Sequence, residues 1–342
     1  MKKIIIFNHK GGVSKTISTF YISWMIAELG HKVLMVDGDP QCNLTELFMG
    51  DKFDEYYENE CTKNENLMNG AAPAFSSKLQ AIKAVSCPKA DENENLFLLP
   101  GHMNLSEYEA QLSFAFTTST AMPVMSNLPG AFNDLITKTA TKIQAEYVLI
   151  DVNPALSVIN EDFFIISDAF IIPTNPDTFS IMAIKSLANI LPRWKKWKDE
   201  HVDFFKESAY PIPAGSPKFI GTIPQRFNIR NGKATKPFKQ KISDLGRVTK
   251  CELVPKLKAG DMMLSSQAYA SAKIPDGTYI LEEIKDFLSL APRCMELRIP
   301  VYKLTEAQLK STGVVKDNQM KNVNEFYALY EKIANKIISV MK

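Results

Sequence analysis

The sequence has little of what would place it in several large classes of protein. Only 5 of its 342 residues are cysteine, no two of them form a Cys-x-x-Cys pair, and its 4 histidines are scattered. A disulfide framework or a bound structural metal is therefore not expected. No apolar run approaches the roughly 20 residues of a transmembrane helix. The first residues enter an apolar strand directly, unlike a secretory signal, so we expect reduced thiols and a cytoplasmic protein.

The chain also lacks a strong charge of either sign. Its 40 Lys and Arg residues against 38 Asp and Glu residues give a formal net charge of +2, so any binding to nucleic acid must come from a local basic cluster. With 45% hydrophobic residues, it can bury a large core. We expect residues 1–342 to form one domain, because single α/β domains can exceed the usual ~100–200 residues.

The most informative segment lies near the N-terminus. Residues 8–16, Asn-His-Lys-Gly-Gly-Val-Ser-Lys-Thr, follow an apolar strand and open a helical pattern. A strand, a glycine-rich turn and a helix N-terminus together direct backbone N–H groups at a phosphate. Lys15 would reach the β- and γ-phosphates, and the Thr16 hydroxyl would contribute to a Mg²⁺ site. The segment is predicted to bind a nucleotide; a glycine-rich turn with two surface lysines is the alternative.

The loop departs from the general phosphate-loop pattern, which has glycine where His9 and Ser14 stand. Its glycine pair is preceded by a second lysine, Lys10. The segment resembles the deviant Walker A loop of the ParA/MinD superfamily of ATPases, and the chain is most similar to ParA/Soj-type partition ATPases. The resemblance implies that Lys10 crosses a dimer interface to the partner's nucleotide. The residues predicted to bind ATP are Lys10, Gly11, Gly12, Val13, Ser14, Lys15, Thr16, Ile17 and Pro255.

Ser14 occupies a position where this family usually has glycine. If the loop requires a left-handed backbone there, a non-glycine residue costs roughly 1–2 kcal/mol. A local hydrogen bond from the serine hydroxyl would recover part of that cost. We expect the substitution to be tolerated for binding and to bear on the rate of turnover.

Two further segments carry carboxylates at the ends of apolar strands. Asp37 and Asp39 follow residues 33–36, and Asp151 ends the strand 147–151. Ligands of open α/β sheets bind at such strand ends. The resemblance implies that Asp39 orients or activates the attacking water, that Lys10 and Lys15 act with it in catalysis, and that Thr16, Asp37 and Asp151 hold Mg²⁺. Helix capping is the alternative role for the first two aspartates. The family usually has glycine where Cys42 stands.

These parts predict slow, Mg²⁺-dependent ATP hydrolysis that a partner protein stimulates. The fold class is α/β: a doubly wound, mostly parallel sheet with helices on both faces, as in P-loop NTPases of the SIMIBI type. We expect strands near residues 3–7, 33–37, 95–99, 147–151, 168–172, 218–223 and 251–254. Insertions beyond a minimal family member are predicted at 51–94, which reads as acidic and loosely packed, at 113–130 and at 272–319, before a C-terminal helix at about 324–341.

A basic stretch at residues 226–258, opposed only by Asp244 and Glu252, suits a phosphate backbone. The resemblance implies non-specific DNA binding by the ATP-bound dimer. A solvated basic face is the alternative. The candidate DNA-binding residues are Arg226, Arg230, Lys233, Lys236, Lys239 and Lys241.

Three function classes follow from the resemblance. The first is a ParA-like ATPase that positions or segregates plasmid, chromosome or other cargo with a ParB-like adaptor, or a relative adapted to another task such as phage defence. The second is a MinD-like regulator that cycles on membranes, for which the C-terminal helix must bind lipid. Its apolar stripe is more typical of a packed helix, so membrane binding is not expected. The third, a relative of the nitrogenase iron protein, requires paired cysteines that this chain lacks.

Overall fold

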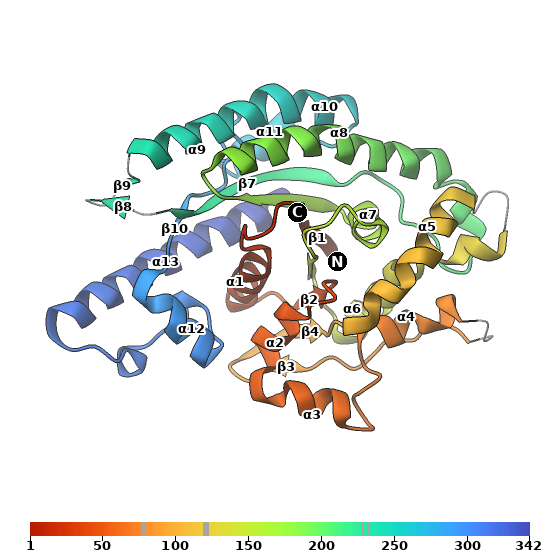
Figure 1. Ribbon diagram of the computed structural model, residues 1–342, viewed down its shortest axis with the longest axis horizontal. Coiled ribbons are helices and arrows are strands. Elements are labelled where there is room, and N and C mark those ends of the chain that lie inside the picture. Colours follow the sequence, from red (N-terminus) through yellow and green to blue (C-terminus); the bar gives the residue numbers. More distant parts are fainter. Residues whose placement is uncertain (77–79, 119–122, 228, 231–232, 235) are drawn as a thin grey trace.

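A single sheet organises the protein. The computed structural model describes residues 1–76, 80–118, 123–227, 229–230, 233–234 and 236–342. Within this part of the chain, eight strands form the sheet in the order β10-β7-β6-β1-β5-β2-β4-β3 (Figure 1). They are β1 (Lys2–Ile6), β2 (Val33–Asp37), β3 (Lys89–Ala90), β4 (Asn93–Leu99), β5 (Tyr147–Asp151), β6 (Ala169–Thr174), β7 (Lys218–Phe227) and β10 (Ile284–Lys285).

All neighbouring strands of this sheet pair in parallel except β3 and β4, which are antiparallel. A separate hairpin joins β8 (Ile229–Arg230) to β9 (Lys233–Ala234). The predicted doubly wound α/β class, with a mostly parallel sheet, is therefore confirmed.

Helices cover both faces of the sheet. They are α1 (Lys15–Glu28), α2 (Asn43–Met49), α3 (Phe53–Glu58), α4 (Leu67–Phe75), α5 (Glu109–Thr118), α6 (Ala131–Ile143), α7 (Val158–Ile165), α8 (Thr178–His201), α9 (Lys236–Val248), α10 (Val254–Ala259), α11 (Ser266–Ser271), α12 (Ala291–Leu297) and α13 (Gly313–Val340). Strand residues alternate between two cores, because successive side chains point to opposite faces. In β1, Ile5 packs with α6–α8, whereas Ile4 and Ile6 pack with α1 and α13.

One predicted strand is wrong. Residues 251–254 lie in a π-helical turn, Thr249–Leu253, and at the start of α10, so that residues 236–259 are helical almost throughout. The apolar residues Leu245, Leu253 and Leu257 are buried in the core shared with α8. Their helical spacing outweighs the short apolar run from which a strand was predicted. The structure has one parallel strand that was not predicted, β10, which lies inside the predicted insertion 272–319.

The other predicted insertions contain regular structure as well. The region 51–94 holds α3, α4 and β3; α4 buries Leu67 and Ala71 fully, whereas α3 has no fully buried residue. The region 113–130 continues α5 to Thr118, and residues 119–122 lie outside the described part of the chain.

The C-terminal helix begins earlier than predicted, at Gly313 in place of residue 324. Its apolar stripe is buried: Phe326 and Tyr330 are at most 2% exposed, and the Tyr330 ring contacts Tyr21 of α1. Packing against the sheet's helices, the expected arrangement, is therefore confirmed. Among the described residues, no helix has both the length and the apolar character needed to cross a membrane.

Candidate nucleotide site

The glycine-rich loop connects β1 to the N-terminus of α1, as the sequence predicted. Lys15, the first residue of α1, is 7% exposed, and its Nζ lies 3.4 Å from the Lys10 carbonyl oxygen. Burial lowers the pKa of Lys15, and the charges of Asp151 and Asp39 oppose that shift. A buried ammonium group therefore lies at the helix N-terminus, where an anion is also favoured by the backbone N–H groups.

The two positions where the family usually has glycine share one backbone conformation. Ser14 has φ 56° and Cys42 has φ 53°, both in the left-handed region. Neither side chain makes a capping hydrogen bond to the helix that it precedes, so the recovery expected for Ser14 through such a bond does not occur. Non-glycine residues in this region cost roughly 1–2 kcal/mol, and such strain is typical of functional loops.

This strain predicts that Ser14→Gly stabilises the protein. Glycine removes the left-handed penalty but gains unfolded-state entropy, so the free energy of unfolding should rise by about 0.5–1 kcal/mol. Urea unfolding measures the change. Ser157→Gly is the matched control, since Ser157 has φ −82° and caps α7 through its side chain, and it should lose stability. A loss at both positions would contradict the prediction.

Lys10 is bound within its own chain. Its Nζ lies 2.5 Å from Asp177 Oδ2 and 3.1 Å from Ser180 Oγ. Asp177 is the N-cap of α8, where its other oxygen accepts the Ser180 N–H at 2.7 Å. The side chains of Lys10 and Asp177 are 18% and 39% exposed, and an ion pair so open to solvent contributes only about 0–1 kcal/mol. The lysine can therefore leave this contact at little cost.

Strand register brings two of the carboxylates together. Asp37 of β2 is directly opposite Asp151 of β5, and Asp151 is opposite Ile6 of β1. The close pairing of the two strands extends to Gly38, whose N–H donates to the Asp151 carbonyl at 2.9 Å. A Cβ at Gly38 would lie 2.7 Å from the Phe163 ring and 2.9 Å from that carbonyl. Only glycine fits there without displacement of the loop that carries Asp39.

Asp37 and Asp39 also make local hydrogen bonds. Asp37 is fully buried, and its Oδ2 accepts the N–H of Thr45 at 2.8 Å and the Thr45 hydroxyl at 2.6 Å. Asp39 Oδ1 accepts the Gln41 N–H at 2.9 Å. Asp37 thus satisfies an N–H in the first turn of α2, which is the capping role that the sequence left open. Burial raises the pKa of Asp37 to about 6, an effect that the Thr45 hydrogen bonds oppose.

Asp151 differs, because one of its oxygens has no partner. Oδ2 is buried without a hydrogen bond among the described residues, and Oδ1 is 3.5 Å from the Thr19 hydroxyl. Burial, together with the charge of Asp37, raises the pKa of Asp151 to about 8, against the opposing effects of Thr16 and Lys15. A buried carboxylate without compensation is unfavourable, and a cation beside it removes that penalty.

These observations fit a magnesium ion. The Thr16 hydroxyl and Asp151 are oxygen donors of the type that Mg²⁺ prefers, and it usually binds one or two carboxylates together with waters and substrate phosphates. Across the described ranges, no three His, Cys, Asp or Glu side chains gather as a metal cage. An ion held here therefore needs the nucleotide to complete its shell.

The structure adds residues that the sequence argument missed. Asn175 Nδ2 donates to the Gly12 carbonyl at 3.0 Å, and Gln225 Nε2 donates to the Val13 carbonyl at 2.8 Å. Both residues follow or end strands at the same edge of the sheet. Their position at a strand end was the one available signal, but a single amide side chain there has no specific spacing.

Two further predicted site residues lie in surroundings that the sequence did not indicate. Pro255 is in the first turn of α10, beside Lys256, whose Nζ contacts Asn189 in the middle of α8. The predicted strand at 251–254 is replaced here by helical structure, and nucleotide binding by Pro255 stays a prediction. Arg226 has φ 60°, and one guanidinium nitrogen lies 3.5 Å from the Gly12 carbonyl. Arg226 is thus at the phosphate loop, apart from the basic residues that follow.

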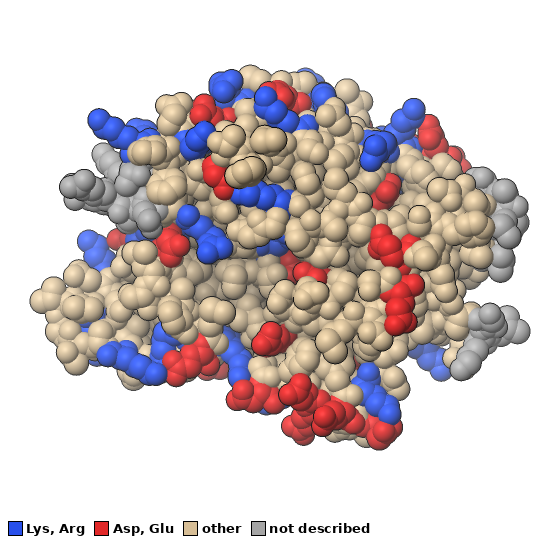
Figure 2. All heavy atoms as spheres, in the orientation of Figure 1, with Lys and Arg blue, Asp and Glu red and all other residues tan. Residues whose placement is uncertain are grey.

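The remaining candidate DNA-binding residues lie on the hairpin and α9. Arg230 and Lys233 are paired across β8 and β9, and Lys236, Lys239 and Lys241 lie on α9. Figure 2 shows Lys and Arg side chains along the upper part of the molecule, where α8–α10 lie in Figure 1, whereas Asp and Glu side chains gather over α3 at the lower edge. On the face shown, the densest acidic group thus lies away from α8–α10.

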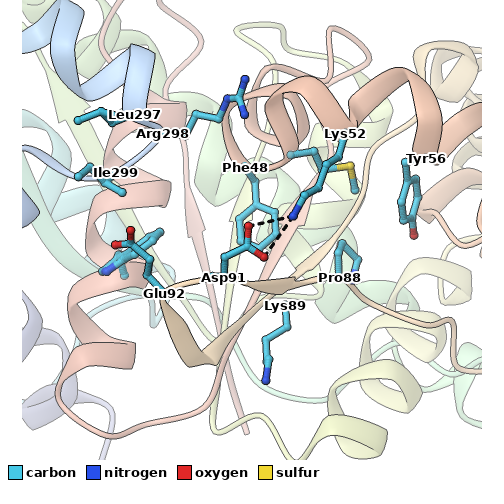
Figure 3. A pocket seen from close by; sticks show the side chains of 13 residues that line it. Phe48, Lys52, Tyr56, Pro88, Lys89, Asp91, Glu92, Leu297, Arg298 and Ile299 are labelled. Carbon is cyan, nitrogen blue, oxygen red and sulfur yellow. Dashed lines mark hydrogen bonds and ion pairs between the residues drawn. The ribbon is translucent and has the colours of Figure 1, made fainter.

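A cavity of about 240 Å³ lies where the regions 51–94 and 272–319 meet (Figure 3). Lys52 and Asp91 form an ion pair of 2.9 Å at this cavity, and Arg298 reaches Asp51 at 2.5 Å. No residue of the phosphate loop lines it. The two regions are thus joined to each other, and the second is part of the domain's packed structure.

Residues 1–204 match the family AAA_31, an AAA domain. The chain belongs to this family, and with its deviant Walker A loop it is a member of the ParA/MinD superfamily of ATPases, as the resemblance predicted.

Two relatives show the extent of the sequence similarity. The chain is 28% identical over 196 residues to the uncharacterized protein MJECL24 of Methanocaldococcus jannaschii. The aligned residues cover 57% of this chain and 67% of that protein. The chain is 26% identical over 188 residues to the sporulation initiation inhibitor protein Soj of Bacillus subtilis, which covers 55% and 64%. The match therefore spans about two thirds of these relatives.

Solved structures share the fold over nearly the whole chain. Protein DIP2308 of Corynebacterium diphtheriae gives a TM-score of 0.65 at 19% identity and covers 89% of this chain and 98% of its own. The ATP complex of a McdA variant from Cyanothece gives 0.57 at 18%, with 95% of each chain covered. The pNOB8 ParA bound to nonspecific DNA gives 0.55 at 16% and covers 99% and 98%. These structures therefore share the fold of this chain at low sequence identity.

Proposed function

We propose that this protein is a slow, Mg²⁺-dependent ATPase whose ATP-bound form is a homodimer that binds DNA without sequence preference. The observation that carries the proposal is the phosphate loop with Lys10 and Lys15 beside the unpartnered Asp151 oxygen at one sheet edge. Together with a ParB-like adaptor, such a switch would position or segregate a DNA or protein cargo in the cytoplasm. The McdA–ATP complex is a structural relative with the same nucleotide.

In this proposal each group at the loop has one task. Lys15 and the backbone N–H groups of the loop bind and orient the phosphates. Lys10 of each subunit adds a positive charge at the nucleotide of the other subunit. Asp39 holds the attacking water in line, since phosphoryl transfer depends chiefly on positioning and charge stabilisation. Thr16, Asp37 and Asp151 would hold Mg²⁺, and the ion would neutralise charge on the phosphates.

The surroundings of Lys10 support dimerisation through this face. Phe179 and Met182, one turn apart at the start of α8, are 70% and 59% exposed, and Leu156 beyond β5 is 48% exposed. Exposed apolar side chains next to a functional loop are typical of protein interfaces. Membrane binding through α13, the alternative function, has less support, because the apolar stripe of that helix is buried.

The face of α9 supports DNA binding. Its buried residues include Ile242, Leu245 and Val248, whereas Lys236 and Lys239 are exposed. Lys241 donates to the Thr178 hydroxyl at 3.1 Å, which places α9 beside the start of α8. In a dimer joined at that face, two copies of the basic helix would lie on one assembly. The pNOB8 ParA is a structural relative that was solved on nonspecific DNA.

Binding to random-sequence duplex DNA tests this proposal. The wild type should bind only with ATP and Mg²⁺, with an affinity that falls steeply as salt rises. Lys236→Glu with Lys239→Glu should weaken binding about tenfold or more and reduce the salt slope by about 1 for each of the two lysines that neutralises a phosphate in the wild type. Fluorescence anisotropy at two salt concentrations measures both.

The matched control is Lys321→Glu with Lys332→Glu, which makes the same charge change at two exposed lysines of α13. It should leave the salt slope unchanged. Equal weakening by both pairs would show that only net charge matters and would reject α9 as the DNA-binding element. No binding of the wild type in any nucleotide state would reject the DNA-binding function.

A further inference from the structure

The helix α3 lies close to the carboxylates of the nucleotide site. It belongs to the region 51–94, and its six residues include none that is fully buried. We propose that Tyr57 of α3 is a positioning residue that holds Asp37 in place for Mg²⁺-dependent nucleotide binding. The inference rests on the proposed function, because it assumes that Asp37 acts in the magnesium shell.

Three hydrogen bonds connect Tyr57 to Asp37. The Tyr57 hydroxyl donates to the Gly101 carbonyl at 2.6 Å. The Gly101 N–H donates to Thr45 Oγ1 at 3.0 Å, and that hydroxyl donates to Asp37 Oδ2 at 2.6 Å. Gly101 joins the first two bonds, because it accepts at its carbonyl and donates at its N–H, and the Thr45 hydroxyl joins the second bond to the third. We call this series the relay. The position of the carboxylate is therefore tied to that of α3.

The middle of this relay has no free space. A Cβ built on Gly101 would lie 3.1 Å from Asp37 Cγ and 3.2 Å from Cys42 Sγ. The backbone at Gly101 thus packs closely against the carboxylate and against Cys42, the residue that precedes α2. Because close-packed groups transmit displacement, a shift of Gly101 must move Asp37, Cys42 or both.

The neighbouring Tyr56 has no such connection. Its hydroxyl donates to the Glu65 carbonyl at 2.7 Å, which is a bond within the same region of the chain. Tyr56 lines the cavity between the regions 51–94 and 272–319, where Figure 3 labels it. Two adjacent tyrosines of one helix therefore make hydroxyl bonds of similar length, and only that of Tyr57 leads to the nucleotide site. Loss of either hydroxyl removes one buried or half-buried hydrogen bond, so the pair separates a positioning effect from general stability.

The test compares the full-length wild type with Tyr57→Phe and Tyr56→Phe. Equilibrium binding of a fluorescent ATP analogue is titrated with Mg²⁺ and is measured separately in EDTA, and kcat and KM are measured for ATP hydrolysis. Tyr57→Phe should need about fivefold more Mg²⁺ for half-saturation, since one hydrogen bond contributes on the order of 1 kcal/mol. Binding in EDTA should not change. Thr45→Val, which removes the hydroxyl in the middle of the relay, should shift the Mg²⁺ requirement in the same direction.

Tyr56→Phe should titrate as the wild type does. The inference is overturned if Tyr57→Phe has the wild-type Mg²⁺ requirement, if the two variants shift equally, or if the shift is matched in EDTA, which would indicate a loosened fold. A wild type that binds no nucleotide under any condition would instead refute the proposed function, which separates that failure from failure of the relay.

Discussion

Replacement of Lys10 by alanine should abolish the ATP-dependent dimer and leave ATP binding largely intact. In the chain as it stands, Lys10 Nζ is paired with Asp177 Oδ2 at 2.5 Å, and within its own subunit Lys15 supplies the buried ammonium at the phosphate loop. A hydrogen bond to a charged group contributes about 1.5–3 kcal/mol, and a two-fold dimer has two such contacts. The dimerisation constant should therefore fall at least about 100-fold.

Multi-angle light scattering with ATP and Mg²⁺ measures this effect, and a fluorescent nucleotide reports binding. Asp177→Asn is the matched control at the other end of the same ion pair. An asparagine still caps α8, but it no longer holds Lys10 by charge, so dimerisation should persist or strengthen. Unchanged dimerisation of Lys10→Ala would show that the lysine acts within one subunit only.

The loop and the aspartates could be found from the sequence because their chemistry requires fixed residue types in a fixed order. Asp37, Asp39 and Asp151 each follow a short apolar strand, and parallel strands end at one edge of a sheet. The register of Asp37 with Asp151 follows from that topology. The supporting amides, Asn175 and Gln225, could not be found this way, because they contact the loop from strands distant in sequence.

The missing strand at 251–254 has a different cause. A run of a few apolar residues fits a buried strand and a buried helix equally, and the length of the surrounding pattern decides between them. Here Leu245, Leu253 and Leu257 continue one helical stripe. Pro255, a predicted nucleotide contact, lies in the first turn of α10 and not after a strand, and its role at the nucleotide stays a prediction. Arg226, a candidate DNA-binding residue, has one guanidinium nitrogen 3.5 Å from the Gly12 carbonyl of the phosphate loop, and its contact with DNA stays a prediction.

Replacement of Asp39 by alanine should produce a long-lived ATP-bound dimer. Asp39 is 6% exposed, lies close enough to Lys15 for each to influence the other's pKa, and is held by the Gln41 N–H at 2.9 Å. Burial raises the pKa of Asp39, and the Lys15 charge opposes that shift. Its carboxylate is thus fixed beside the phosphate loop without being needed for the Lys10 contact.

Loss of a group that positions the attacking water typically costs about 10²–10⁴ in rate. ATP turnover of Asp39→Ala should therefore fall at least about 100-fold, while ATP binding and dimerisation persist. Release of radiolabelled phosphate gives the rate, and light scattering after removal of free ATP gives the lifetime of the dimer. Asp168→Ala is the control, because Asp168 lies at the opposite end of the sheet, where it accepts the Lys3 N–H at 2.7 Å. A rapid return of Asp39→Ala to monomer with ADP would assign the positioning of the water to another residue. Asp37 would be the least suitable for that role, because its two oxygens already accept hydrogen bonds from Thr45 and Asp39.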